Sequence, residues 1–167
     1  AGTIAASSDN NTGGAGVSWS AKIMPLRVLG KSGGTSYDVM QAVLYAAGLE
    51  NDSGTVPTQR ADVINLSLGG GGFSQAEQDA FTRARAAGVI IVAAAGNNSS
   101  TVASYPAAYH GVVSVGAVDS KLSRAYYSNY GSTLDVAAPG GSFQWDLNGD
   151  GQLDGVMSTH GSDSSGN

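Results

Sequence analysis

The run from Ile90 to Asn97 ends in an asparagine whose side chain could stabilise negative charge on a reacting oxygen. Bulky apolar residues give way to the alanines at 93–95, and the run then breaks at Gly96-Asn97. A buried parallel strand that ends beside a ligand shows this pattern, because small side chains leave room and glycine lets the backbone bend. A carboxamide fixed there has two N–H donors for an oxyanion. The same residues also fit an ordinary turn or capping asparagine after a strand.

Strands and helices alternate around this run. Strands are predicted at 22–29, 61–68, from Ile90, at 112–118 and at 134–137. Helices are predicted from Thr35 or Ser36 to about Leu49, and from a capping box at Ser74 and Glu77 to Gly88. This order predicts an α/β fold: a three-layer, mostly parallel sheet with right-handed crossovers and helices on both faces. With 167 residues, the chain is expected to be one domain or most of one.

Three predicted strand ends are rich in glycine, at 30–34, 69–72 and 96. Ligands of open parallel sheets bind beyond the carboxyl ends of the strands, so a cleft is expected here. A nucleotide site is disfavoured, because Gly69–Gly72 completes neither the dinucleotide fingerprint nor a Gly-Lys-Ser/Thr phosphate loop. The alternative is that the bare backbone of Ser67-Leu68-Gly69 pairs with an extended peptide as an added strand.

Composition excludes several classes of partner. The net charge of −5 argues against nucleic acid and against anionic membrane surfaces. No apolar run approaches the roughly 20 residues that a membrane helix needs. Charged residues make up 13% of the chain and hydrophobic residues 41%, and there are 25 glycines, which indicates tight turns and a close-packed backbone rather than disorder.

Short motifs follow one another along nearly the whole chain: Ala1–Ala6, Lys22–Leu29, Asn65–Gly70, Ala93–Asn97, Tyr105–Ala107, Val115–Val118, Tyr127–Gly131 and Leu134–Gly140. In this order they resemble the subtilisin-like serine protease (subtilase) family, in the segment between the catalytic His and the catalytic Ser. The resemblance implies the subtilisin-like fold, incomplete at both ends, with residues 1–167 as the central part of a single catalytic domain.

The resemblance also assigns roles to particular residues. Asn97 would donate to the tetrahedral oxyanion. In this family, removal of such a donor lowers the stabilisation of the transition state by roughly 3–4 kcal/mol. The pocket for the side chain before the scissile bond would be lined by one wall of Ser67, Leu68 and Gly69, an opposite wall of Ala94, Ala95 and Gly96, and a rim at Ser104. Gly33 and Gly34 would pair with the other edge of the substrate.

The catalytic groups of the family are not found at matching positions. The family uses Asp, His and Ser in that order, and the match places the His before Ala1, the Asp further upstream and the Ser after Asn167. His110 and His160 lie where the family has no catalytic histidine, so no catalytic role is expected for either. His110, in a Tyr-His-Gly turn, is expected at the surface, and His160 lies in a Ser-Thr-His-Gly loop near the missing nucleophile. This chain alone is therefore expected to bind substrate without hydrolysing it.

A second candidate site resembles the first part of an EF-hand calcium loop. Its oxygen ligands would be Asp146, Asn148, Asp150, the carbonyl of Gln152, and Asp154, with Gly151 at the sixth position. Met157 replaces the usual bidentate Glu, so structural Ca²⁺ would bind weakly or with a ligand from elsewhere. A solvated Asn-Gly/Asp-Gly turn is the alternative. The polar loop at 9–12 lies where the family has another calcium loop.

Two interpretations follow. The first is a secreted, calcium-stabilised serine endopeptidase of subtilisin type, whose partners are polypeptide substrates and the missing flanking segments of the same domain. The second is a non-catalytic relative or fragment that binds peptides or calcium. The small residues of the predicted pocket favour a large uncharged side chain in the substrate.

Overall fold

The structure is a computed structural model that describes residues 1–159. The described residues form two compact units, one of residues 1–25 and 155–159, and one of Leu26–Asp154. That the whole chain belongs to a single catalytic domain stays a prediction.

The first unit is built on a short helix, α1 (Gly2–Ala5). The chain returns to it after an exposed polar loop, and the backbone N–H groups of Val17 and Ser18 donate to the carbonyls of Thr3 (3.0 Å) and Ile4 (2.9 Å). Gly16 lies so close to the helix that an added Cβ would be 2.5 Å from the Ala6 nitrogen. Glycine is required there because a real Cβ never lies that close to backbone.

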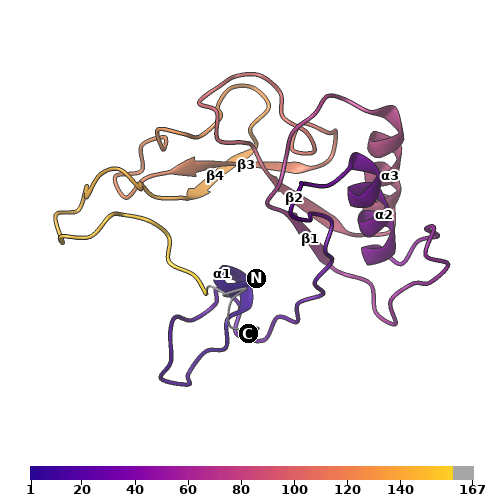
Figure 1. The fold of residues 1–167 in the computed structure, drawn as a ribbon, viewed down its shortest axis with the longest axis horizontal. Helices are drawn as coiled ribbons and strands as arrows, with labels where there is room; N and C mark the ends of the chain where they lie inside the picture. The colour runs from indigo at the N-terminus through magenta and orange to yellow at the C-terminus, as the bar shows by residue number, and fades with distance from the viewer. Residues whose placement is uncertain (160–167) are drawn as a thin grey trace. The chain divides into compact units, whose positions relative to one another are not determined.

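The second unit contains a parallel sheet of four strands (Figure 1). These are β1 (Val63–Leu66), β2 (Ile90–Ala94), β3 (Val113–Val118) and β4 (Val136–Pro139). Their order in the sheet is β1-β2-β3-β4, and every neighbouring pair is parallel. Four of the five predicted strands are therefore confirmed, with ends that differ by a few residues, and so is the α/β class with its parallel sheet.

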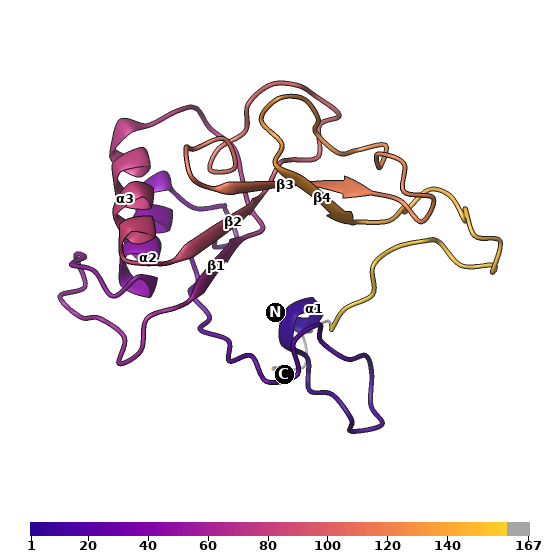
Figure 2. The ribbon, with the colours of Figure 1, turned by 180° about the vertical axis from the view of Figure 1, so that it is seen from behind.

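Two helices, α2 (Ser36–Ala46) and α3 (Gln75–Ala86), lie side by side next to the sheet (Figures 1 and 2). Their buried positions follow the 3.6-residue period of an amphipathic helix. The core they form with the sheet contains Val39, Val43, Leu44, Ala80, Phe81, Ala84, Ile64, Leu66, Ile91 and Ala93. Full burial of one such large apolar side chain contributes about 1.5–3 kcal/mol.

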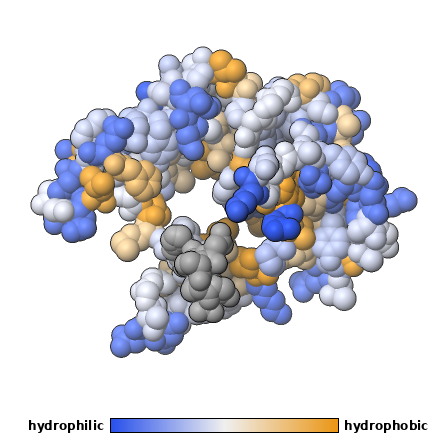
Figure 3. Space-filling view, in the orientation of Figure 1, coloured by the Kyte–Doolittle hydropathy of each residue, from blue (hydrophilic) through white to orange (hydrophobic). Residues whose placement is uncertain are grey.

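Side chains of the other face of the sheet remain exposed. Val63 is 54% exposed and Ile90 56%, whereas Ile64 and Ile91, which follow them in their strands, are buried. Figure 3 shows apolar residues reaching the surface of the molecule in several places. Among the described residues, the helices of this unit therefore cover one face and leave the second one open.

The start of α2 is capped as expected. Thr35 Oγ1 accepts from the Asp38 N–H (3.1 Å), and the Asp38 carboxylate accepts from the Thr35 N–H (3.3 Å). The capping box predicted at α3 is only half formed. Ser74 Oγ accepts from the Glu77 N–H at 3.5 Å, but the buried Glu77 carboxylate accepts from the Tyr109 hydroxyl instead of from the helix cap. Burial, followed by this bond to Glu77, raises the pKa of Tyr109 above its ordinary value.

The predicted strand at 22–29 is wrong. A strand needs a neighbour for its backbone groups, and among the described residues no backbone hydrogen bond is formed by the N–H groups of 22–29. Pro25 has no N–H to contribute. The segment leads instead to an isolated antiparallel bridge between Gly30 and Gly33.

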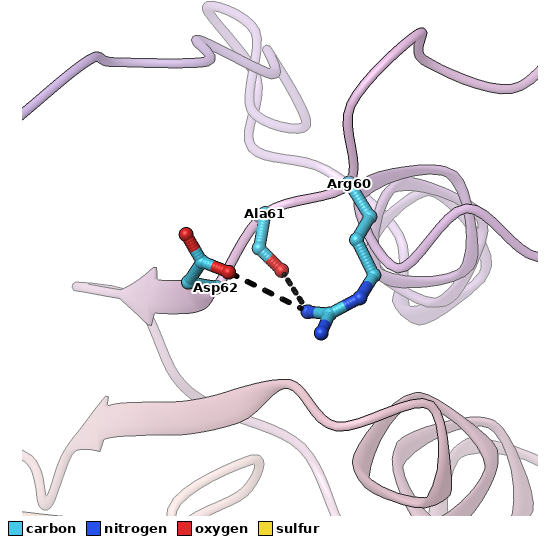
Figure 4. A network of polar contacts seen from close by, with 3 residues as sticks. All are labelled: Arg60, Ala61 and Asp62. Carbon is cyan, nitrogen blue, oxygen red and sulfur yellow. Dashed lines mark hydrogen bonds and ion pairs between the residues drawn. The ribbon is translucent and has the colours of Figure 1, made fainter.

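The entry to β1 is fixed by local contacts. Ala61 N–H donates to the Ala46 carbonyl at the end of α2 (2.8 Å). The Arg60 guanidinium donates to the Ala61 carbonyl (2.9 Å) and lies 3.8 Å from the Asp62 carboxylate (Figure 4). Because both charged side chains are exposed, this ion pair contributes little to stability.

Candidate active site

The structure brings together the ends of β1 and β2, where the substrate pocket is predicted. Leu66 pairs with Ala93 in the parallel register, so Ser67–Gly69 and Ala94–Gly96 leave the sheet as neighbours. Ala95 continues the pairing, since its N–H donates to the Val115 carbonyl of β3 (2.9 Å). The two predicted walls thus start from adjacent strands.

Ser104 lies against both walls. A Cβ placed on Gly69 would be 3.2 Å from Ser104 Oγ, and one placed on Gly96 would be 3.6 Å from the same atom. The Gly70 N–H donates to the Tyr105 carbonyl (2.9 Å), which joins the end of the first wall to the segment of Ser104. Gly69, Gly96 and Ser104 therefore form one cluster, and the role of Ser104 as the rim of a pocket stays a prediction.

The backbone of Ser67–Gly69 is open to an added strand. β1 is an edge strand of the sheet, and the segment continues it beyond Leu66. Ser67 and Gly69 are exposed, and within residues 1–159 no backbone hydrogen bond is formed by the N–H groups of 67–69. An extended peptide can pair with such an edge through its own backbone.

Asn97 is exposed at the carboxyl end of β2, directly after a backbone bend at Gly96. Gly96 has a φ of +109°, a conformation that L residues rarely adopt. The residues on both sides of Asn97 are held by hydrogen bonds to the buried Asn129. The Asn129 backbone N–H donates to the Gly96 carbonyl (3.0 Å), and its Oδ1 accepts from the Asn98 N–H (2.9 Å). The Asn97 carboxamide is thus presented to solvent from a fixed turn.

Gly33 and Gly34 lie in the turn before α2. The Gly33 N–H and carbonyl both pair with Gly30, at 3.2 and 2.8 Å. A Cβ on Gly34 would be 2.0 Å from the Val28 carbonyl oxygen, so this position requires glycine for local packing. Their pairing with a substrate edge stays a prediction.

The predicted surface position of His110 fits the structure. Its ring is exposed, and its backbone N–H and carbonyl pair with the Gln78 side chain at 2.9 and 3.1 Å. His160 lies outside the described residues.

The loop of Asp146–Asp154 folds around the carboxylate of Asp146. This carboxylate accepts from the N–H groups of Gly149 (2.6 Å), Asp150 (3.2 Å) and Gly151 (2.8 Å). These bonds, with that from Gly151 the largest, lower the pKa of Asp146. Gly151 has a φ of +86°, which is the turn that the sixth position of a calcium loop needs.

The other predicted ligands of this loop are also engaged. The Asn148 and Asp150 side chains accept from the N–H groups of Asp150 (2.9 Å) and Gln152 (2.8 Å), and the Asp154 carboxylate accepts from the Ser120 hydroxyl (2.7 Å). A carboxylate has about four acceptor sites, so Asp146 keeps about one free for a cation. Within residues 1–159, no three acidic, His or Cys side chains converge as a metal cluster. Calcium binding stays a prediction.

Asn129 and Ser128 are the site residues to which the sequence analysis gave no role. Both are buried. A Ser-Asn-Tyr-Gly stretch is typical of a surface turn, and nothing in the local pattern points to the partners of Asn129, which lie about thirty positions earlier in the chain.

Together, the parallel sheet, the open edge strand and the exposed carboxamide at the strand ends define an α/β protein with a site suited to an extended chain. The subtilase family model matches residues 1–167, and the chain belongs to this family. Two curated relatives are similar to it. An extracellular protease of Xanthomonas campestris pv. campestris is 42% identical over 150 residues, and subtilisin DY of Bacillus licheniformis is 42% identical over 145 residues.

A solved protease structure from Pseudoalteromonas arctica PAMC 21717 has the same fold, with a TM-score of 0.83 and 44% identity. The match covers 86% of this chain and 43% of that protein. The chain spans only part of its relatives: the alignments take in 89% and 84% of it, but 26% of the Xanthomonas protease and 49% of subtilisin DY. Within residues 1–159, no helix is both long and apolar enough to cross a bilayer.

Proposed function

We propose that the full-length protein is a secreted serine endopeptidase of subtilisin type, and that this chain supplies its oxyanion donor and substrate-binding edge. The observation that carries the proposal is the cluster of Gly69, Gly96 and Ser104 beside the exposed Asn97. Membership of the subtilase family supports the reaction class. The names of the relatives, which include an extracellular protease, support secretion.

In this proposal the substrate lies extended along Ser67–Gly69 and pairs with its backbone as an added strand. The side chain before the scissile bond enters between this segment and Ala94–Gly96. The scissile carbonyl then lies at the Asn97 carboxamide, whose N–H donates to the oxygen as it becomes negative. A fixed donor stabilises the transition state more than the ground state, because the oxygen carries more negative charge in the transition state and the donor does not have to reorganise to meet it.

The nucleophile and the base come from elsewhere in the protein. Subtilases use a Ser activated by a His that an Asp orients, and we place all three outside this chain. The chain alone should therefore bind peptides without cleaving them. The alternative function, a non-catalytic peptide- or calcium-binding relative, requires that the natural product has no such groups.

The missing segments of the same domain would be the partners of the open sheet face. Val63 and Ile90 expose more than half of their surface there, as does Val136 at 51% on the edge strand β4. Burial of each would contribute up to about 1.5–3 kcal/mol, so a covering segment would stabilise the sheet substantially.

Structural calcium at the loop of Asp146–Asp154 is also part of the proposal. Oxygen donors at alternate positions and a glycine in the required turn support it. The ion would hold the loop closed and would take no part in peptide-bond hydrolysis.

The test is the activity of the full-length protein on a chromogenic peptide, with and without a Ser-directed inhibitor. Asn97→Ala should lower kcat about 10²–10³-fold with a smaller change in KM, since it removes one oxyanion donor. Asn51→Ala is a matched control, because Asn51 also makes several hydrogen bonds but lies in the loop before β1. Inhibitable turnover by residues 1–167 alone, or an unchanged kcat in Asn97→Ala, would contradict the proposal.

A further inference from the structure

We propose that Asn129 is a positioning residue that sets the orientation of the Asn97 carboxamide. The inference rests on the proposed function, since it assigns the support of the same oxyanion donor. Asn129 itself does not contact the substrate in this proposal. It acts through the turn at 95–100, which carries Asn97.

The Asn129 side chain joins points on both sides of Asn97. Its Nδ2 donates to the Ala95 carbonyl (2.9 Å), two residues before Asn97. Its Oδ1 accepts from the N–H groups of Asn98 (2.9 Å) and Ser100 (3.3 Å). One planar amide therefore bridges the backbone before and after Asn97, and leaves the Asn97 side chain exposed. An aspartate cannot replace it fully, because it has no N–H for the Ala95 carbonyl.

Asn129 is itself held against the sheet. The Ser128 hydroxyl accepts from the Ala117 N–H of β3 (2.9 Å) and donates to the Asn129 carbonyl (2.9 Å). Only 5% of the surface of Asn129 is exposed, and a buried polar group that loses its hydrogen-bond partner destabilises the fold. The turn of Asn97 is thus connected to a central strand.

Further contacts fix the same two segments to each other. The Ser99 N–H donates to the Tyr127 carbonyl (2.8 Å), and the Tyr130 N–H donates to the Ser100 carbonyl (3.0 Å). The Arg124 guanidinium donates to the Ser99 hydroxyl (3.0 Å) from a position 4.5 Å above the Tyr130 ring. These bonds hold the turn at 95–100 close to the segment that carries Asn129, whereas the amide of Asn129 sets the path of the backbone next to Asn97.

The close approach of Asn129 also accounts for Gly96. A Cβ at this position would lie 2.6 Å from Asn129 Nδ2, so the amide fills the space that a side chain would need. Oxyanion donors act only when they are fixed at the right place, and displacement of a reacting group by about 1 Å can lower a rate about 10²-fold. Loss of the Asn129 bridge should therefore reduce the chemical step more than substrate binding.

A double-mutant cycle in the full-length protein tests this inference. We expect Asn129→Ala to lower kcat about 10–100-fold with little change in KM. In an Asn97→Ala background the same substitution should cost almost nothing more, because the donor that Asn129 orients is already gone. Asn51→Ala should leave kcat unchanged in both backgrounds. Asn129→Asp keeps the two accepted hydrogen bonds, so its kcat should lie between those of the wild type and Asn129→Ala. If Asn129→Ala does not fold, Asn129→Asp takes its place in the double-mutant cycle.

The possible failures can be distinguished. If Asn97→Ala lowers kcat and the two losses simply multiply in the double variant, Asn129 has only a structural role and this inference is wrong. An unchanged kcat in Asn129→Ala would also show that the positioning role of Asn129 is wrong. If Asn97→Ala itself has no effect on kcat, both the oxyanion role and the positioning role are overturned.

Discussion

Replacement of Gly96 by alanine would test the packing around Asn97 in physical detail. At a φ of +109°, an L residue is strained, at a cost of about 1–3 kcal/mol. The new methyl group would also lie 2.6 Å from Asn129 Nδ2 and 3.2 Å from Asn129 Cγ. Crowding of a packed interior costs about another 1–3 kcal/mol. We therefore expect the free energy of unfolding to fall by about 2–6 kcal/mol.

Two other glycines separate the cost of backbone strain from the cost of crowding by the added methyl group. Gly71 has a φ of +74° with no atom within 4 Å of an added Cβ, so Gly71→Ala should cost only the strain, about 1–2 kcal/mol. Gly72 has open space and no positive φ, and Gly72→Ala should stay within about 0.5 kcal/mol of the wild type. Urea unfolding of the full-length protein at one pH measures all three. If Gly96→Ala loses no more than Gly71→Ala, the contact of Gly96 with Asn129 is not as tight as described.

Three further predictions concern stability. Tyr109→Phe should destabilise the fold by about 1–3 kcal/mol, since the buried Glu77 carboxylate loses its hydrogen-bond partner. The control Tyr130→Phe, at an exposed ring, should not destabilise it. Equal urea midpoints for the two variants would refute the role of the Tyr109 hydroxyl. Because the pKa of Tyr109 is raised above 10.0 in the fold, its contribution is complete below that pH and is lost as the pH rises through the folded value. Stability measured from about pH 9 to about pH 11 should thus fall more in the wild type than in Tyr109→Phe, and parallel curves would contradict the shift. Calcium at 100 times its Kd should add about 2.7 kcal/mol to the free energy of unfolding. A chelator or Asp146→Asn should abolish this stabilisation, whereas the control Asp62→Asn should retain it. A melting curve that does not change with chelator would refute the calcium site.

Much of the fold follows from local rules in the sequence. The small and β-branched runs at β1, β2 and β3 specify buried parallel strands, and the cap predicted at Thr35 or Ser36 marks the start of α2. The neighbouring positions of Ser67–Gly69 and Ala94–Gly96 also follow, because parallel neighbours carry their carboxyl ends to the same edge of the sheet.

The features that the sequence did not predict depend on partners that are distant in the chain. Residues 22–29 have the composition of a strand, yet a strand forms only where a neighbour completes its hydrogen bonds. Glu77 matches a capping box in sequence, but the Tyr109 hydroxyl competes for its carboxylate. Asn129 resembles a turn residue, and its role depends on carbonyl and N–H groups that only the folded chain brings to it.

The order of the strands has a consequence for how the sheet is made. Because β1, β2, β3 and β4 are neighbours in space in the order in which they occur in the chain, β2, β3 and β4 each meet a completed neighbour as they emerge from the ribosome. These four strands can then assemble by addition at a single growing edge, and within residues 1–159 none of the four has to wait for a later part of the polypeptide to be synthesised. The turn that carries Asn97 is the exception, since it takes its final shape only after Asn129 has been translated.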